Sequence, residues 1–254
     1  MSGPVLIGVD TACQQVHAVF TTRRGGAGAG PFSSLGLGAA NGDDPAAVRA
    51  NRDAVAQAAG FDASRAVALA QVHGAEVVRV GEAGGDGRFV GSLEGLAEAD
   101  ASVTTSPGVA LAALGADCPV VLLWSADGVA VGAAHAGWRG LIAGVLEAAV
   151  AGLGVPPHSV RAAVGPRVGP CCYPVDATLR QAMSDRFGPQ VVNGDAVDLG
   201  LACIAALRGA GVEADAISVV GACTSCDSER FFSYRRDGAA TGRQAGIVWI
   251  GESA

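Results

Sequence analysis

Two histidines and one cysteine stand beside predicted strand ends, where short loops present side chains for chemistry. His73 lies in the segment QVHG, Cys118 follows a buried strand, and His135 ends another apolar strand. If they converge, two imidazoles and one thiolate would bind Zn²⁺ and leave a fourth position for water, as in catalytic zinc sites. The long gaps between them match no standard ligand spacing, so His73 and His135 could equally be hydrogen-bonded core histidines.

Cys118, His135 and Asp117 are the candidate catalytic residues. A zinc ion would lower the pKa of a bound water toward about 7 and make it a nucleophile. Asp117 would be costly to bury without a partner, and it could orient a metal ligand. Alternatively, Cys118 is itself a nucleophile with His135 as its base. Zinc would occupy the thiolate that such an attack requires, so metal content separates the two hypotheses.

The other histidines and cysteines favour structural roles. His17 lies within a strand pattern and His158 follows two prolines in a turn. Cys223 and Cys226 form a CxxC motif, and Cys171 is followed directly by Cys172. Four thiolates could hold a structural metal, but adjacent cysteines rarely share one tetrahedral ion and no second CxxC exists. We therefore expect buried thiols that fill the core.

Arginines and aromatic residues gather near the C-terminal end, in the segment FFSYRRDGAATGR at 231–243. Arginine suits carboxylate or phosphate, and aromatic faces suit a flat ring. A buried ion-pair network with Asp237 would explain the same pattern. With arginines near the other motifs, the candidate substrate-binding residues are Arg23, Arg139, Tyr234, Arg235, Arg236 and Arg243.

The elements that must position these residues alternate between strands and helices without a regular βαβ rhythm. This favours a single domain over 1–254, of mixed-sheet α/β or α+β class. An Asp44–Pro45 start and a Gly60 stop predict a helix over 46–59. Further helices are expected after His135 and over 197–207. Strands are expected at 16–22, within 67–80, and at 101–105, 109–114, 129–134, 161–164, 217–220 and 247–250.

Composition limits the possible partners. The net charge is −7 and the sequence pI is about 5.0, which argues against nucleic acid, because non-specific binding requires basic residues. The N-terminal segment lacks a secretory pattern, so a cytoplasmic location is expected. The apolar run from Gly108 to Trp124 contains Asp117 and Pro119, so two buried segments are predicted instead of a membrane helix.

Taken in order, the motifs resemble the YfiH-like, or laccase-domain, family over nearly the whole chain. The segments that carry the resemblance are TTRRGG (21–26), SSLGLG (33–38), GDDP (42–45), QVHG (71–74), ADCPVVLL (116–123), HAGWRGL (135–141), GPCCYPV (169–175) and FFSYRRDGAATGR (231–243). The resemblance implies a zinc site at His73, Cys118 and His135. It also implies one domain with a mixed β core flanked by helices, similar to the cytotoxic-necrotizing-factor/YfiH-like fold. Gly36, Arg167 and Pro174 depart from the family pattern.

The family resemblance implies a zinc-dependent purine nucleoside enzyme that phosphorolyses adenosine, inosine or methylthioadenosine and deaminates adenosine. Its partners would be a purine nucleoside and phosphate, with Cu²⁺ a possible substitute for zinc. The alternatives are a cysteine-type amidase that edits peptidoglycan precursors, a copper-dependent polyphenol oxidase and a non-catalytic zinc module. Four histidines cannot build the type 1 and trinuclear copper centres of a laccase.

Overall fold

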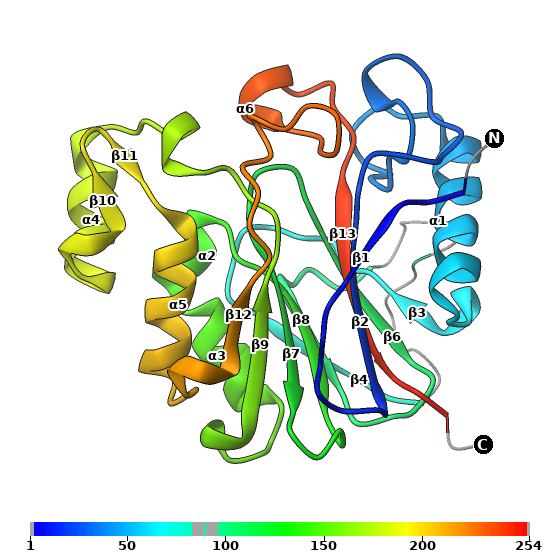
Figure 1. Cartoon of the computed structure of the whole chain (residues 1–254), viewed down its shortest axis with the longest axis horizontal. Coiled ribbons are helices and arrows are strands. Elements are labelled where there is room, and N and C mark those ends of the chain that lie inside the picture. Colours follow the sequence, from blue (N-terminus) through cyan, green and yellow to red (C-terminus); the bar gives the residue numbers. More distant parts are fainter. Residues whose placement is uncertain (1–2, 83–88, 90–95, 253–254) are drawn as a thin grey trace.

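The computed structural model describes residues 3–82, 89 and 96–252. A five-stranded sheet forms one half of the fold (Figure 1). Its strand order is β1-β2-β13-β6-β3, and all neighbours are antiparallel except β3 and β6. The strands are β1 (Leu6–Gly8), β2 (Val16–Thr21), β13 (Gln244–Ile250), β6 (Ala110–Gly115) and β3 (Ala66–Val67). β13 therefore lies at the centre, between β2 and β6.

A six-stranded sheet forms the other half, in the order β12-β9-β7-β8-β5-β4. The outer pairs β12/β9 and β4/β5 are parallel, and the inner pairs are antiparallel. The strands are β12 (Ile217–Val219), β9 (Val160–Val164), β7 (Val120–Ser125), β8 (Val131–His135), β5 (Ala101–Thr104) and β4 (Val77–Val80), and a separate hairpin pairs β10 (Val192–Asn193) with β11 (Ala196–Val197). The predicted mixed-sheet α/β fold is confirmed.

Alternating side chains along β7 explain why the two sheets stack. Leu122 and Trp124 pack into the core between the sheets, whereas Val121 and Leu123 join the core beneath the helices. Successive residues of a strand point to opposite faces, so a strand that is apolar throughout must be covered on both sides. All residues of β7 are buried, so this strand is covered on both faces.

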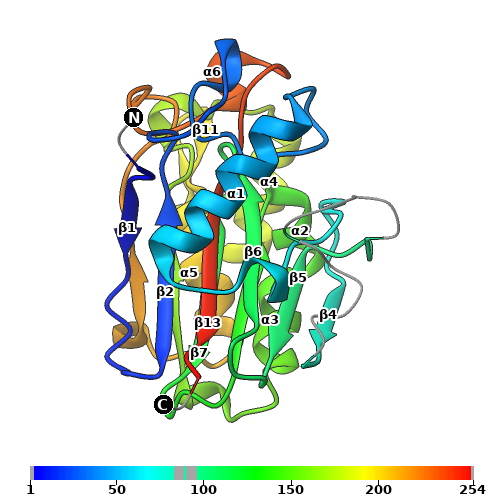
Figure 2. The same ribbon diagram turned by 90° about the vertical axis from the view of Figure 1, so that its right-hand side faces the viewer.

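Helices cover both outer faces. Figure 2 shows α1 (Pro45–Ala59) crossing the outer face of the five-stranded sheet. In Figure 1 four further helices lie against the face of the six-stranded sheet that is turned away from the five-stranded sheet. They are α2 (Trp138–Ala143), α3 (Val145–Gly152), α4 (Ala177–Phe187) and α5 (Leu199–Gly209), and a short helix, α6 (Tyr234–Asp237), precedes β13.

The helix ends follow local chemistry. Asp44 caps α1 by accepting from the Ala46 N–H, and Gly60 ends it at φ 85°, as predicted. The sequence predicted one helix after His135, whereas the structure has two, because Gly144, at φ 91°, ends α2 and begins α3. The sequence did not predict α4, because only Met183 and Phe187 of that helix are buried and no apolar stripe marks it.

The run from Gly108 to Trp124 forms β6 and β7, which confirms the prediction of two buried segments. Within the described residues, no helix has the length and apolar character needed to cross a membrane.

Candidate functional site

Three strand ends of the six-stranded sheet meet at one edge. The start of β7 lies opposite the end of β8, with Val120 paired to His135. Ala134, one residue earlier in β8, is paired to Ala101 at the start of β5. The residues just outside these strands, Asp100 and Cys118, therefore lie beside His135. β4 runs parallel to β5, so the loop before β4, which contains His73, reaches the same edge.

The structure brings His73, Cys118 and His135 together. Their ligand atoms all lie within 4.8 Å of one another. The two imidazole rings meet edge to face, with centroids 4.8 Å apart and an interplanar angle of 82°. His135 is buried, Cys118 is half-buried and His73 is exposed. This group could hold one metal ion at a position open to solvent on the His73 side.

Asp100 orients two of these ligands. One carboxylate oxygen is 2.8 Å from Nδ1 of His135, which directs Nε2 toward the site. The same carboxylate accepts from the backbone N–H groups of Val72, His73 and Gly74 at 3.1, 3.0 and 2.7 Å. These bonds hold His73 in the left-handed region at φ 63°, which few residues other than glycine adopt. Burial opposes ionisation, but the bonds from His135 and the backbone lower the pKa of Asp100.

Asp100 has the role that the sequence suggested for Asp117. Asp117 is buried and has its own partners: the Thr224 hydroxyl donates to it at 2.6 Å and the Arg235 N–H at 2.5 Å. It therefore holds the Thr224 and Arg235 segments next to Cys118. The available signal for Asp100 was a carboxylate directly before the strand predicted at 101–105.

Cys118 and His135 polarise each other. Burial raises the pKa of a thiol, but the attraction and hydrogen bonds of His135 and His73 lower that of Cys118 to about 6. Burial lowers the pKa of an imidazole, but the Cys118 thiolate and Asp100 raise that of His135 to about 9. Without a metal, the pair is a thiolate beside an imidazolium at neutral pH.

Gly137 leaves room for the ligands. A Cβ atom there would lie 3.1 Å from Cys118 Sγ and 3.2 Å from His73 Cδ2. Both distances are shorter than ordinary van der Waals contacts, so a side chain would push against the site. The first glycine of the HAGWRGL segment, Gly137, is thus required by close approach.

Tyr173, Arg139, Arg235 and Arg243 form a rim beside Cys118, close enough for electrostatic interaction within the group. Arg235 lies over the Tyr173 ring at 4.8 Å, and Arg139 lies over the Trp138 ring at 4.3 Å. Burial and the Cys118 charge raise the pKa of Tyr173 to about 12, although Arg235 and Arg139 oppose them. Burial lowers the pKa of Arg243, and the charges of Cys118 and Asp117 act against this. The sequence analysis missed Tyr173, although it stands within the GPCCYPV segment.

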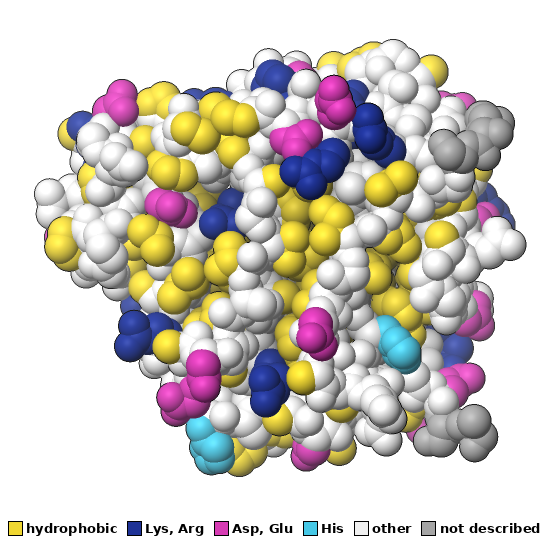
Figure 3. Space-filling view, viewed as in Figure 1, with side chains coloured by type: hydrophobic (Ala, Val, Ile, Leu, Met, Phe, Trp, Pro, Cys, Tyr) yellow, Lys and Arg dark blue, Asp and Glu magenta, His cyan; other side chains and the backbone are white. Residues whose placement is uncertain are grey.

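The remaining predicted binding residues differ in what they contact. Arg236 donates to the carbonyls of Thr224, Ser225 and Phe231 and pairs with Asp237 at 2.7 Å, as the ion-pair hypothesis predicted. Arg23 lies over the Phe232 ring at 4.6 Å and donates to two backbone carbonyls. Figure 3 shows basic and acidic side chains gathered over the end of the molecule that carries α6. Tyr234 is 54% exposed there.

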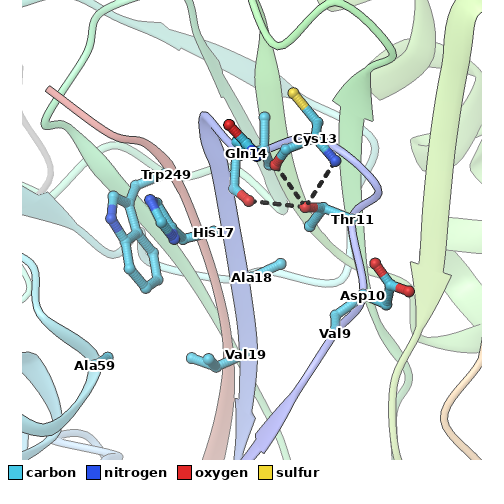
Figure 4. A pocket seen from close by; sticks show the side chains of 11 residues that line it. Val9, Asp10, Thr11, Cys13, Gln14, His17, Ala18, Val19, Ala59 and Trp249 are labelled. Carbon is cyan, nitrogen blue, oxygen red and sulfur yellow. Dashed lines mark hydrogen bonds between the residues drawn. The ribbon is translucent and has the colours of Figure 1, made fainter. Parts of the chain in front are cut away.

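His17 lies away from this site. It stacks on Trp249, with ring centroids 5.2 Å apart, near the end of the pairing between β2 and β13. Both residues line a surface pocket of about 340 Å³ near the β1–β2 connection (Figure 4). β13 starts beside Gly115, close to Cys118, and ends at this pocket, so a whole strand separates the two.

The four remaining motif cysteines contradict one expectation. Cys171, Cys172, Cys223 and Cys226 do not fill the core: Cys171 and Cys226 are exposed, and the other two are half-buried. Their sulfur atoms lie within 4.8 Å of one another, so they form a second group that could hold a metal ion. The sequence analysis considered a four-thiolate site and set it aside, because adjacent cysteines rarely share one tetrahedral ion.

Comparison with known proteins places the chain among relatives of nearly equal length. It is 42% identical to a Streptomyces coelicolor protein named purine nucleoside phosphorylase SCO2081, over 96% of this chain and all of that protein. It is 38% identical to purine nucleoside phosphorylase YfiH of Escherichia coli K12, over 92% of this chain and 94% of that protein.

Solved structures share the fold over almost the full chain. The crystal structure of the Bacillus licheniformis hypothetical protein YfiH matches with a TM-score of 0.88 at 30% identity, covering 98% of this chain and 97% of that one. YlmD from Geobacillus stearothermophilus matches with a TM-score of 0.87 at 33% identity, covering 94% and 93%. A family model described as multi-copper polyphenol oxidoreductase laccase matches residues 17–251. The chain therefore belongs to this laccase-domain, or YfiH-like, family.

Proposed function

We propose that this chain is a zinc-dependent purine nucleoside phosphorylase that acts on adenosine, inosine or methylthioadenosine. The observation that carries the proposal is the three-residue group at His73, Cys118 and His135, held by Asp100 and bordered by arginines. The names of the relatives, from SCO2081 to the Escherichia coli YfiH, support the same activity.

His73, Cys118 and His135 would hold the zinc ion, and the donor set of two imidazoles and one thiolate fits zinc with one open position. Bound there, zinc would supply Lewis-acid chemistry. A multi-copper centre does not fit: the chain has four histidines, and His17 and His158 lie outside this group. A single Cu²⁺ could replace zinc, since it binds nitrogen and sulfur sites more tightly.

Arginines would bind phosphate. Within the part of the chain that the structure describes, Arg139, Arg235 and Arg243 form no ion pair. In phosphorolysis, a phosphate oxygen bonds to C1′ of the ribose, and the glycosidic bond breaks with its electron pair going to the base nitrogen, which then takes a proton. A cluster of guanidinium groups would capture the anion against the net charge of −7.

Aromatic hydroxyls would orient the nucleoside. The Tyr173 phenol, with a pKa of about 12, stays protonated at neutral pH and can donate a hydrogen bond to a base nitrogen or a phosphate oxygen. The exposed ring of Tyr234 offers a face on which a purine can stack. We also propose that adenosine is deaminated at this site, with water consumed and ammonia and inosine released.

The test is adenosine turnover by zinc-loaded protein with increasing phosphate. Adenine and ribose 1-phosphate should form at a rate that saturates with phosphate, and Arg243→Ala should raise the KM for phosphate far more than that for adenosine. Arg161→Ala, at an exposed arginine of β9, is the matched control. Absence of adenine at saturating phosphate would refute the phosphorylase.

A second candidate function rests on the chain of contacts from Cys118 to His135 and from His135 to Asp100. A thiol beside an imidazole that a carboxylate orients is also the arrangement of a cysteine nucleophile. This amidase hypothesis predicts hydrolysis of muropeptide precursors by metal-free protein and inhibition by added zinc. The phosphorylase proposal predicts the opposite effect of zinc on turnover.

A further inference from the structure

Two segments that leave the same edge of the six-stranded sheet carry four cysteines. Cys171 and Cys172 lie in a short 3-10 turn, Pro170–Cys172, beyond β9. Cys223 and Cys226 lie in a turn beyond β12. β9 and β12 are parallel neighbours, and a bridge between Arg167 and Cys223 continues their pairing, so the two turns meet.

The sulfur geometry is that of ligands around one ion. Sγ of Cys226 lies 3.6 Å from that of Cys171 and 3.4 Å from that of Cys172. A disulfide bond requires about 2.0 Å. Four thiolates at about 2.3 Å from a tetrahedral zinc ion lie about 3.8 Å from one another. The observed separations are close to that value and far from a covalent bond.

Two further observations separate this cluster from ordinary packing. The Gly169 N–H donates to Cys223 Sγ at 3.2 Å, which is the kind of bond that stabilises a sulfur ligand. Cys171 and Cys226 are exposed, whereas Cys203 is fully buried in the core beneath the helices, so packing does not explain the exposed pair. The adjacent pair can share one ion because both sulfurs reach Cys226 from a single turn.

We propose that Cys171, Cys172, Cys223 and Cys226 bind a second zinc ion, separate from the one at His73. Four protein ligands complete the tetrahedron and leave no position for water or substrate, so this ion is structural. It ties the segment before Tyr173 to the segment that contains Thr224. The Thr224 hydroxyl donates to Asp117, directly before Cys118, so the ion stabilises one wall of the candidate site.

Metal analysis combined with X-ray absorption tests the site. Wild-type protein should contain about two Zn²⁺ per chain, and His73→Ala should keep about one. In His73→Ala, the remaining zinc should have only sulfur neighbours at about 2.3 Å, without the nitrogen shell at about 2.0–2.1 Å that histidine ligands give. The double variant Cys223→Ser/Cys226→Ser should lose one ion. Cys13→Ser, a half-buried cysteine outside both groups, should keep both.

Several results would overturn the proposal. These are one zinc in the wild type with none in His73→Ala, a nitrogen shell around the ion that remains in His73→Ala, or an intact mass showing that the cluster is purified as disulfides. Full zinc content in the double cysteine variant would also refute it. If that variant does not fold, His73→Ala decides alone, because its cysteine cluster is unchanged. None of these measurements depends on phosphorylase activity.

Discussion

Replacing Asp100 with asparagine should weaken zinc binding, because the amide cannot reproduce the carboxylate's contacts. One oxygen of Asp100 accepts from the His73 N–H at 3.0 Å and from Nδ1 of His135 at 2.8 Å. The other accepts from the N–H groups of Val72 and Gly74 at 3.1 and 2.7 Å. Asparagine keeps one acceptor oxygen and places an NH₂ group at the other position, so in either orientation two N–H donors face a donor.

The magnitude follows from these bonds. Hydrogen bonds to a charged group contribute about 1.5–3 kcal/mol each, and Asp100→Asn loses two of them. Part of the loss falls on folding, since three of the four donors belong to the backbone before β4. The rest of the lost hydrogen-bond energy misorients His135 and His73, and so it weakens metal binding. Loss of such an orienting carboxylate lowers metal affinity about 10–100-fold, equivalent to about 1.4–2.8 kcal/mol.

The assay is zinc competition against a chromophoric chelator, with thermal unfolding of the same metal-free protein. Asp100→Asn should raise the Kd for zinc at the site of His73, Cys118 and His135 by about 10–100-fold. The control is Asp215→Asn, at an exposed position before β12, which should leave the Kd unchanged. A Kd within about twofold of the wild type, with a lowered Tm, would show that Asp100 supports only the loop. No change in either quantity would refute the hydrogen-bond geometry.

Three further perturbations act on separate features. Gly137→Ala should lower zinc affinity at least severalfold, because the new Cβ would lie 3.1 Å from Cys118 Sγ. The zinc affinity of the wild type should decrease as the pH is lowered, because the ion needs a Cys118 thiolate and a neutral His135. Their pKa values of about 6 and about 9 predict a loss of about tenfold per pH unit as the pH falls from 9 to 6, and a steeper loss below 6, where the thiolate is protonated as well. Arg236→Ala should lower the free energy of unfolding by about 2 kcal/mol or more, measured by urea denaturation, because three backbone carbonyls lose a charged donor.

Each of these predictions has an opposing result, and the two substitutions have matched controls. Gly209→Ala is matched to Gly137→Ala, because no described residue beyond its own neighbours places an atom within 4 Å of a Cβ at that glycine. Unchanged affinity in Gly137→Ala would mean that the ligands do not approach this backbone. Zinc binding that is independent of pH from 6 to 9 would contradict the protonated state of His135. Arg161→Ala should have the same free energy of unfolding as the wild type. If Arg236→Ala also has the wild-type value, the contacts of Arg236 with the three carbonyls do not stabilise the protein.

The sequence predicted the parts of the site that follow from strand ends. His135 ends β8 and Cys118 follows β6, as the apolar segments indicated, and Asp44 and Gly60 mark the ends of α1. These features are local, since each depends on residues within a few positions of the chain.

The sequence could not predict features that depend on distant backbone. The partners of Asp100 are N–H groups 26–28 positions earlier, held by the parallel pairing of β4 with β5. Backbone donors carry no residue-type signal. The cysteine pairs likewise meet through the parallel pairing of β9 with β12, which joins segments separated by α4 and α5.

The central position of β13 constrains how the protein folds during synthesis. The Ala245 N–H donates to Thr21 Oγ1 across 224 positions of the chain, and β13 joins β2 to β6. Until β13 leaves the ribosome, β2 and β6 each expose an unpaired, apolar edge, the kind of surface on which other chains aggregate. Contacts of such long range also slow folding, because a large loop must close before they form. In a nascent chain, β2 and β6 are therefore the edges exposed to intermolecular pairing until residues 244–250 have emerged.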